Sequence, residues 1–191
     1  MKASVFCDVV DPWSYLGATR FERAAAMFTI LTGEVVEIAY RAARIDSPVD
    51  EDRVIAAARI SGIELDLDDR VPADSTDAWR LLTWAAESGE VVQRDLLHQL
   101  WRAHLLEGAD VADAMVLSSR AALAGLPLGT AEALLASTDY AADVDRQRAT
   151  AREIGAHELP FIVVEADRTL SGLLSQDDYL QAIHQIHRDP R

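Results

Sequence analysis

Residues 3–14 read Ala-Ser-Val-Phe-Cys-Asp-Val-Val-Asp-Pro-Trp-Ser, and this stretch decides the fold. The mostly apolar run at 3–10 predicts a strand. Asp11 followed by Pro12 is the favoured order of an N-cap and a first helical residue. Apolar side chains then recur at helical spacing as far as about Leu31. The stretch therefore predicts a strand that leads directly into the N-terminus of a helix.

The rest of the chain carries sheet signals on both sides of a long helical block. Residues 35–40 are rich in β-branched side chains and predict a second strand, whereas the span 50–139 is helical in pattern throughout. A helix at 140–154, strands at 161–164 and 168–171, and a last helix after Ser175 follow. The sequence therefore predicts an α/β fold with an all-helical segment inserted after the second strand.

Composition and charge exclude several classes of protein. The chain has 191 residues and a formal net charge of −14, which argues against binding nucleic acid or anionic membranes. No apolar stretch approaches the ~20 residues of a membrane helix. The N-terminal run does not resemble a signal peptide, because Lys2 is the only early cation and Asp8 interrupts the run. We therefore expect a cytoplasmic protein.

Three segments carry a family resemblance. Residues 8–17, Asp-Val-Val-Asp-Pro-Trp-Ser-Tyr-Leu-Gly, are similar to the pattern Asp-Val-x-Cys-Pro-Trp-Cys-Tyr-x-Gly. Residues 75–80 are similar to a polar segment at a helix start, and residues 152–161 to the lead-in to a cis-proline strand. Together they resemble the DsbA-like family, in the branch of FrnE-type dithiol oxidoreductases, kappa-class glutathione transferases and 2-hydroxychromene-2-carboxylate isomerases. The resemblance implies a thioredoxin fold with a large all-helical insertion, in which 1–45 and 140–191 form the thioredoxin-like domain and 46–139 the insertion.

The departures from the family pattern fall at its reactive positions. Asp11 stands where the oxidoreductases carry the nucleophilic cysteine and the glutathione-using relatives a catalytic serine, and Ser14 replaces the resolving cysteine. Leu173 and Leu174 stand where glutathione-using relatives typically have a small polar residue followed by Asp. The one cysteine, Cys7, lies within the first predicted strand, where we expect a small buried hydrophobe without a disulfide partner.

Asp11 and Ser14 are the candidate catalytic residues. Asp11 is either the N-cap of the helix, which the Asp-Pro order favours, or a carboxylate at a cleft mouth that acts as a general base or hydrogen-bond acceptor. The Ser14 hydroxyl could stabilise an anion beside the free N–H groups of the first helical turn. No histidine lies close in sequence to activate Ser14 as a nucleophile.

The candidate ligand-binding residues are Trp13, Trp79, Leu159 and Pro160. The resemblance places both tryptophans beside the family's cleft, so we expect them to line an apolar pocket between the core and the helical block. It also implies a cis bond between Leu159 and Pro160, which exposes backbone groups near residues 158–159 to an extended peptide or thiol ligand.

We therefore predict a protein of an oxidoreductase family that has lost dithiol–disulfide exchange and binds a small molecule or peptide in the former active-site cleft. The alternative is an isomerase or transferase that uses a low-molecular-weight thiol as cofactor. The intact Pro12, Trp13 and Tyr15 scaffold favours the alternative, whereas Asp11 and Glu158 would repel an anion such as glutathione.

Two further expectations concern partners. Several relatives in the branch are homodimers, so we expect a homodimer. His184 and His187 share one helix face but have no evident third ligand, so we predict no metal site.

Overall fold

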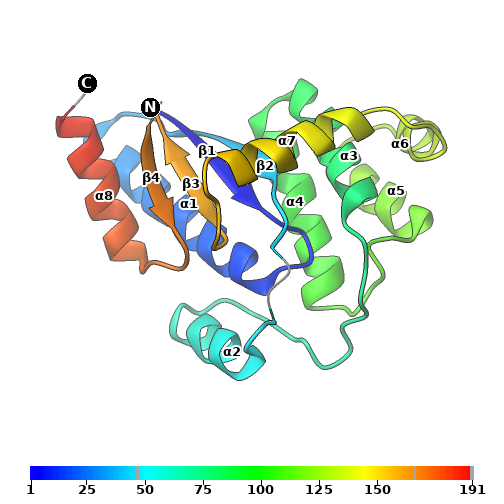
Figure 1. Ribbon diagram of the computed structural model, residues 1–191, viewed down its shortest axis with the longest axis horizontal. Coiled ribbons are helices and arrows are strands. Elements are labelled where there is room, and N and C mark those ends of the chain that lie inside the picture. Colours follow the sequence, from blue (N-terminus) through cyan, green and yellow to red (C-terminus); the bar gives the residue numbers. More distant parts are fainter. Residues whose placement is uncertain (46–47, 166, 190–191) are drawn as a thin grey trace.

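The computed structural model describes residues 1–45, 48–165 and 167–189 (Figure 1). The first part of the chain forms β1 (Lys2–Cys7), α1 (Pro12–Thr32) and β2 (Glu37–Ala42). A helical stretch follows: α2 (Glu51–Ile60), α3 (Thr76–Ala85), the 3-10 turn η1 (Ala86–Ser88), α4 (Glu90–Leu105), α5 (Ala114–Leu123) and α6 (Leu128–Leu135). The chain ends with α7 (Ala141–Glu153), β3 (Phe161–Val164), β4 (Arg168–Ser171) and α8 (Gln176–Arg188).

The four strands form one mixed sheet in the order β2-β1-β3-β4. β1 runs parallel to β2, with Val5 opposite Tyr40, and antiparallel to β3, with Val5 opposite Ile162. β4 returns antiparallel beside β3. The first strand therefore lies at the centre of the sheet, and the strand pairing joins the two ends of the chain.

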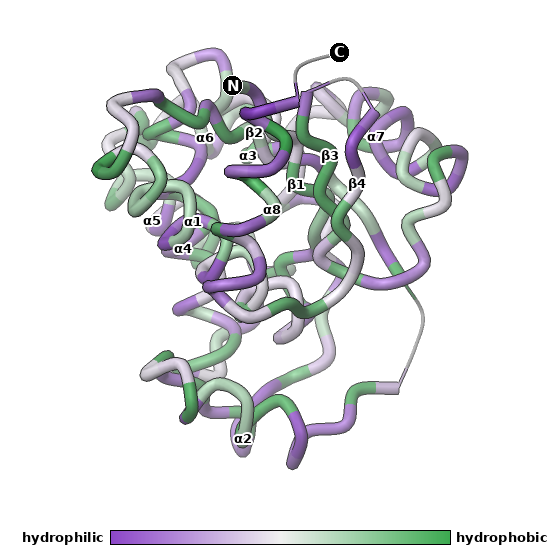
Figure 2. The backbone as a smooth tube through the Cα atoms, turned by 90° about the vertical axis from the view of Figure 1, so that its left-hand side faces the viewer, coloured by the Kyte–Doolittle hydropathy of each residue, from purple (hydrophilic) through white to green (hydrophobic). Residues whose placement is uncertain are grey.

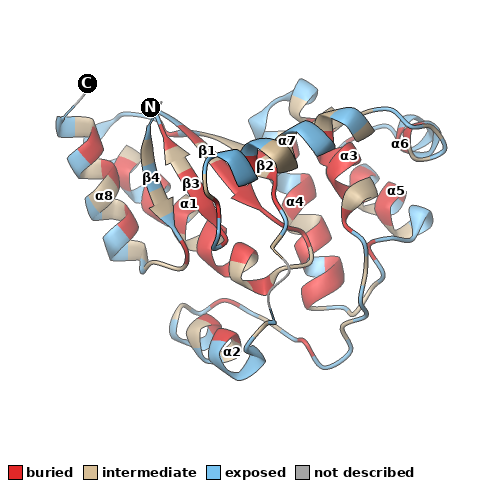
Figure 3. Ribbon diagram, viewed as in Figure 1, coloured by how far each residue is buried: buried red, intermediate tan, exposed pale blue. Residues whose placement is uncertain are grey.

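Alternation along β1 divides the core into two layers. Val5 and Cys7 belong to the large core cluster that also contains Phe21 of α1 and Tyr179 of α8. Phe6, between them in sequence, packs in a smaller cluster with residues of α7 and the β3 strand. Because successive side chains of a strand point to opposite faces, α1 with α8 covers one face and α7 the other. Figure 3 shows β1 as buried along most of its length, whereas the edge strand β4 is only partly buried.

The helical stretch α3–α6 packs beside the sheet, whereas α2 stands apart from it (Figures 1 and 2). Trp79, Leu82, Leu97 and Trp101 are fully buried and fill the space between α3 and α4. At α2, Arg20 of α1 donates hydrogen bonds to Ala57 O and to the hydroxyl of Ser61, and these bonds hold the C-terminal end of the helix.

The outer edge of β2 is bonded to two glutamines. The side-chain oxygen of Gln93, from α4, accepts the Tyr40 N–H at 3.0 Å, and its amide nitrogen donates to Tyr40 O at 3.0 Å. Gln147, from α7, accepts the next outward N–H of the strand, that of Ala42, at 2.8 Å. The outer edge of β2 is therefore bonded at Tyr40 and Ala42, although the described residues place no further strand beyond it in the sheet.

The predicted order of elements and the α/β class are confirmed, with shifts at two strand ends. The first strand ends at Cys7 rather than residue 10, because the Asp8 N–H turns to the Ser14 hydroxyl. The second begins at Glu37 rather than Val35, where its partner strand begins at Lys2. The division at residues 46 and 139 stays a prediction, and residues 46–47 lie outside the described residues.

No helix within the described part of the chain combines the length and apolar character that a membrane span requires.

α1 passes very close to Pro160. A Cβ added at Gly17 would lie 2.4 Å from Pro160 Cδ and 2.5 Å from Cγ, well inside van der Waals contact. Gly17 is itself buried in the middle of the first half of α1. The absence of a side chain at Gly17 therefore sets how closely the first helix approaches the loop before β3.

We expect Gly17→Ala to lower the free energy of unfolding by about 1–3 kcal/mol, because overpacking outweighs the better helix propensity of alanine. Gly129→Ala in α6 is the matched control, since an added Cβ there meets nothing within 4 Å. We expect the control to be neutral or to stabilise by up to about 1 kcal/mol. Urea denaturation measures both, and equal stability of the two variants would contradict the close packing.

Candidate functional site

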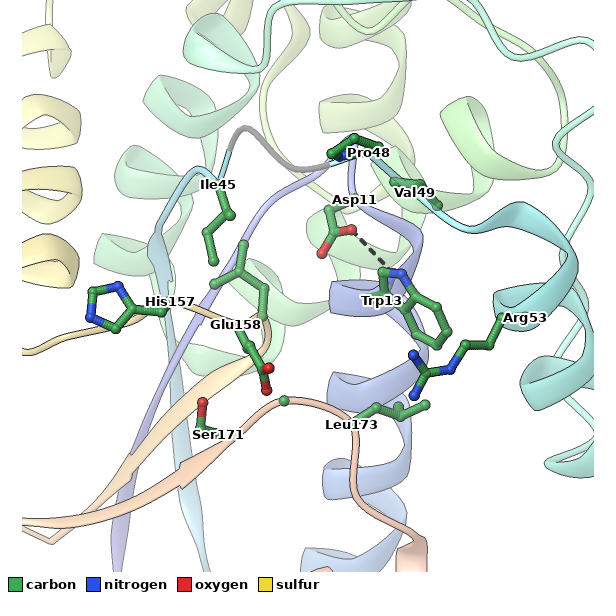
Figure 4. A pocket seen from close by; sticks show the side chains of 12 residues that line it. Asp11, Trp13, Ile45, Pro48, Val49, Arg53, His157, Glu158, Ser171 and Leu173 are labelled. Atoms are coloured by element: carbon green, nitrogen blue, oxygen red, sulfur yellow. Dashed lines mark hydrogen bonds between the residues drawn. The ribbon is translucent and has the colours of Figure 1, made fainter.

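Asp11 caps the N-terminus of α1. Its carboxylate accepts the Ser14 N–H at 2.8 Å, and Pro12 takes the first helical position. The carboxylate also accepts the Trp13 N–H at 3.3 Å, the bond drawn in Figure 4. Two of the N–H groups that a helix leaves free at its start are thereby satisfied by the chain itself. The side chain is only half-buried and faces a pocket, so both interpretations of Asp11, the cap and the cleft carboxylate, fit its position.

Ser14 is fully buried and bonded on both sides. Its hydroxyl donates to Asp11 Oδ2 at 2.6 Å and accepts the Asp8 N–H at 3.0 Å. A ligand in the pocket cannot reach this hydroxyl without a rearrangement of α1. The candidate catalytic residues therefore lie together, but only Asp11 lies at the surface of the pocket.

Asp8 is a buried carboxylate that sequence analysis did not single out. It is 3% exposed, and its carboxylate accepts the Trp79 indole N–H at 3.3 Å, while its carbonyl accepts that of Trp101 at 3.1 Å. Burial raises the pKa of Asp8, and hydrogen bonds from Ser75 and Trp79 oppose that rise. An acid within an apolar strand run was the signal that could have identified it.

The expectation that Trp79 lines the pocket is corrected. Its side chain is fully buried, it is bonded to Asp8, and it is not among the residues that line the pocket. Large aromatic side chains bury much apolar area, and a buried indole N–H requires an acceptor, which Asp8 supplies. Trp79 thus fixes the helical stretch to the end of β1 from inside the core.

Cys7 is fully buried in β1. Burial raises the pKa of its thiol well above the usual value, and the nearby carboxylates of Asp8 and Asp11 raise it further. A thiol in this environment stays protonated at neutral pH and is a poor nucleophile.

A pocket of about 450 Å³ lies at the N-terminus of α1 (Figure 4). Its walls come from four parts of the chain. The lining residues are Asp11 and Trp13 of α1; Ile45, Pro48, Val49 and Arg53 around the start of α2; His157, Glu158 and Leu159 before β3; and Ser171, Gly172 and Leu173 after β4.

The loop before β3 presents Leu159 to the pocket and places Pro160 behind it. The peptide bond between them is cis. Leu159 lines the pocket, whereas Pro160 is buried against Gly17 and is not among the lining residues. Within the described residues, neither the N–H nor the carbonyl of Leu159 forms a hydrogen bond. This residue therefore offers the pocket an unpaired donor and acceptor.

The charged groups of the pocket are two carboxylates and one guanidinium. Burial raises the pKa of Asp11 to about 6, against the opposing hydrogen bonds from Ser14 and Trp13, and the charge of Asp8 adds to the rise. Glu158 is exposed, and Arg53 lies over the Trp13 ring, with Cζ 5.5 Å from its centroid. Arg53 was not anticipated, because no sequence pattern connects α2 with the start of α1.

A family model described as the DSBA-like thioredoxin domain matches residues 3–184. The chain belongs to this family. The thioredoxin fold with its helical insertion is thereby confirmed. No curated protein sequence matches the chain.

Solved structures agree with the membership. A protein described as a probable DsbA oxidoreductase from Streptomyces coelicolor is 27% identical, with a TM-score of 0.86 over 100% of this chain and 92% of that one. The cytosolic disulfide reductase DsbM from Pseudomonas aeruginosa is 22% identical, with a TM-score of 0.70 over 98% and 99%. A 2-hydroxychromene-2-carboxylate isomerase is 18% identical, with a TM-score of 0.71 over 98% and 95%.

We expect Asp11→Asn to gain stability relative to the parent protein as the pH rises from about 4 to 7. The folded-state pKa of about 6 lies above the ordinary aspartate pKa of 3.8. The ionised form therefore favours the unfolded chain, and its cost appears as the pH passes through that window. Asn keeps most of the cap but carries no charge.

Urea denaturation of parent and variant at several pH values measures this difference. Asp113→Asn is the matched control, because Asp113 caps α5 through the same pair of backbone bonds but is exposed. For the control, we expect the difference in unfolding free energy from the parent protein to stay constant between about pH 4 and 7. The same constant difference for Asp11→Asn would show that burial does not disfavour the ionised Asp11 carboxylate.

Proposed function

We propose that this protein has lost dithiol–disulfide exchange and binds a small molecule or peptide in the pocket at the start of α1. The observation that carries the proposal is the bonding of Asp11 and Ser14 to each other and to the helix N-terminus. The family resemblance assigns the two reactive cysteines to these positions. Here Asp11 caps the helix by accepting the Ser14 N–H, and the Ser14 hydroxyl donates a hydrogen bond to the same carboxylate.

Exchange chemistry needs an accessible thiolate and a second thiol to resolve the mixed disulfide. The chain has one cysteine, and that cysteine is fully buried. Its raised pKa keeps it protonated. Neither requirement is met by the parent protein.

Binding is supported by the shape and chemistry of the pocket. Its volume of about 450 Å³ is within the usual range for small-molecule sites. Its wall combines apolar side chains, among them Ile45 and Leu173, with charged and polar ones. Leu159 presents an N–H and a carbonyl that have no hydrogen-bond partner among the described residues. These groups could pair with an extended peptide or with a polar small molecule.

We expect the parent protein to leave the rate at which dithiothreitol alone reduces insulin disulfides unchanged in a turbidity assay, and the double variant Asp11→Cys with Ser14→Cys to accelerate that reduction. The helix N-terminus would lower the pKa of a thiol at position 11, and position 14 would supply the resolving thiol. Loss of the cap should lower the free energy of unfolding by about 1 kcal/mol.

Asp11→Cys alone is the matched control, because it introduces the first thiol without the second. Its mixed disulfides can be resolved only by dithiothreitol, so we expect it to accelerate the reduction less than the double variant does. Turnover by the parent protein that survives Cys7→Ser would refute the loss of exchange chemistry. A folded double variant without activity would show that the site differs from its relatives in more than two residues.

The alternative function is an isomerase or transferase that uses a low-molecular-weight thiol. A structure of DsbM is described as holding GSH, and that protein is 20% identical to this chain. The unpaired backbone of Leu159 suits such a ligand. Against it, Asp11 already binds the N–H groups of Trp13 and Ser14, and its charge would repel a thiolate.

Calorimetric titration with glutathione, mycothiol and bacillithiol separates the two functions. We expect no saturable heat for any of the three thiols, because the donors at the helix N-terminus are occupied. Saturable binding of one thiol that is abolished by a change at Leu173, on the pocket wall, would establish the alternative.

We also propose a cytoplasmic location, which the cytosolic disulfide reductase among the structural neighbours supports, and a homodimeric state. Light scattering tests the homodimer, because the monomer has a mass of 20.9 kDa and a dimer would have twice that mass.

A further inference from the structure

We propose that the ligand of this pocket is a small amphipathic cation whose guanidinium or ammonium group takes the place over Trp13 that Arg53 occupies. This inference rests on the proposed function and names the class of ligand. It follows from the position of Arg53 over the Trp13 ring and from the two carboxylates, Asp11 and Glu158, that line the same pocket.

The face of Trp13 already holds a cation. The guanidinium carbon of Arg53 lies 5.5 Å from the centroid of the indole ring, within the range of a cation–π contact. Arg53 is exposed, and within the described residues its guanidinium forms neither a hydrogen bond nor an ion pair. Among the described residues only the indole face holds the guanidinium, so a competing cation could displace Arg53 into solvent at little cost.

The pocket is poorly suited to an anion. The N–H groups of Trp13 and Ser14 bind the Asp11 side chain, and that of Tyr15 binds Asp11 O at 3.3 Å. The start of a helix normally attracts anions through these groups. Here the chain supplies its own carboxylate, which leaves no donor at the helix start for a second one.

Two carboxylates of the pocket have no cationic partner among the residues that the structure describes. Asp11 and Glu158 both line it, and neither forms an ion pair with any described residue. Glu158 lies over Gly172, because a Cβ added there would come within 2.6 Å of Glu158 Oε2. Figure 4 shows the two carboxylates approaching the cavity from different elements, α1 and the loop before β3. A bound cation would lie in the field of both.

Apolar side chains form one part of the remaining wall, beside His157 and Ser171. Ile45, Val49, Leu159 and Leu173 line the same cavity as the charged groups. An apolar group attached to the cation could therefore leave water at the same time. The combination selects an amphipathic ligand over a simple inorganic or fully polar cation.

The test uses three probes on the full chain: N-benzoylargininamide, its uncharged citrulline analogue and glutathione. The citrulline compound replaces the guanidinium by a urea of nearly the same shape. We expect the arginine compound to bind at least roughly tenfold more tightly than the citrulline compound, and glutathione not to bind. Calorimetry and quenching of tryptophan fluorescence measure the affinities.

Variants locate the cation. Arg53→Ala should tighten binding of the arginine compound by roughly threefold to tenfold, because the competing guanidinium is removed. Glu158→Gln should weaken it by a similar factor, and Trp13→Leu should abolish it. Arg59→Ala on the exposed side of α2 and Glu153→Gln on α7 are the matched controls, and we expect no change. Circular dichroism checks that Trp13→Leu is folded. Glu158 is exposed, so Glu158→Gln tests the proposal without a risk of misfolding.

Equal affinity for the arginine and citrulline compounds, or weaker binding in Arg53→Ala, would overturn the inference. Binding of glutathione instead would overturn it and support the thiol-dependent alternative. The loss of exchange chemistry is measured separately by the insulin assay, so the cation can fail as ligand while that part of the proposed function holds.

Discussion

The hydrogen bond from the Ser14 hydroxyl to the Asp11 carboxylate connects the end of the central strand to the start of the first helix. Because the same hydroxyl accepts the Asp8 N–H, the turn between β1 and α1 is closed from both sides. Asp8 in turn accepts hydrogen bonds from two indole N–H groups: its carboxylate accepts that of Trp79 in α3, and its backbone carbonyl accepts that of Trp101 in α4. The orientation of the helical insertion relative to the sheet therefore depends on a few polar groups at one end of β1.

This arrangement places two carboxylates, Asp8 and Asp11, in a weakly solvated region beside Cys7. Such a region would disfavour a thiolate at the same place, since each carboxylate raises the pKa of the cysteine that is present. In a redox-active relative the helix N-terminus must stabilise negative charge on sulfur. Here the helix N-terminus stabilises the Asp11 carboxylate, so the scaffold is retained while its electrostatic task has changed.

Local signals predicted the scaffold well. Asp11 with Pro12 marked the first helix, Ser175 marked the last, and the apolar periodicity placed the strands within a few residues. Asp11, Trp13 and Leu159, three of the predicted site residues, line the pocket, and their roles there stay predictions.

Features that depend on tertiary packing were not predictable from one sequence. Trp79 was predicted to line the pocket, but its side chain is fully buried. The packing of α3 against α4 decides this burial, and no spacing in the sequence reveals it. The contact between Arg53 and Trp13 joins two elements 40 positions apart and follows no pattern. Asp8 was visible as an acid in an apolar run, but its partners became evident only when the helices were placed.

The two glutamines beside β2 have a consequence for solubility. An exposed strand edge is a template on which a second chain can add a strand, and this is a common route to aggregation. Gln93 binds both the N–H and the carbonyl of Tyr40, and Gln147 binds the next outward N–H, so this edge offers a second chain few free partners. Gln93 of the helical insertion and Gln147 of α7 thus make the β2 edge of the sheet a poor template for a strand from another copy of the chain.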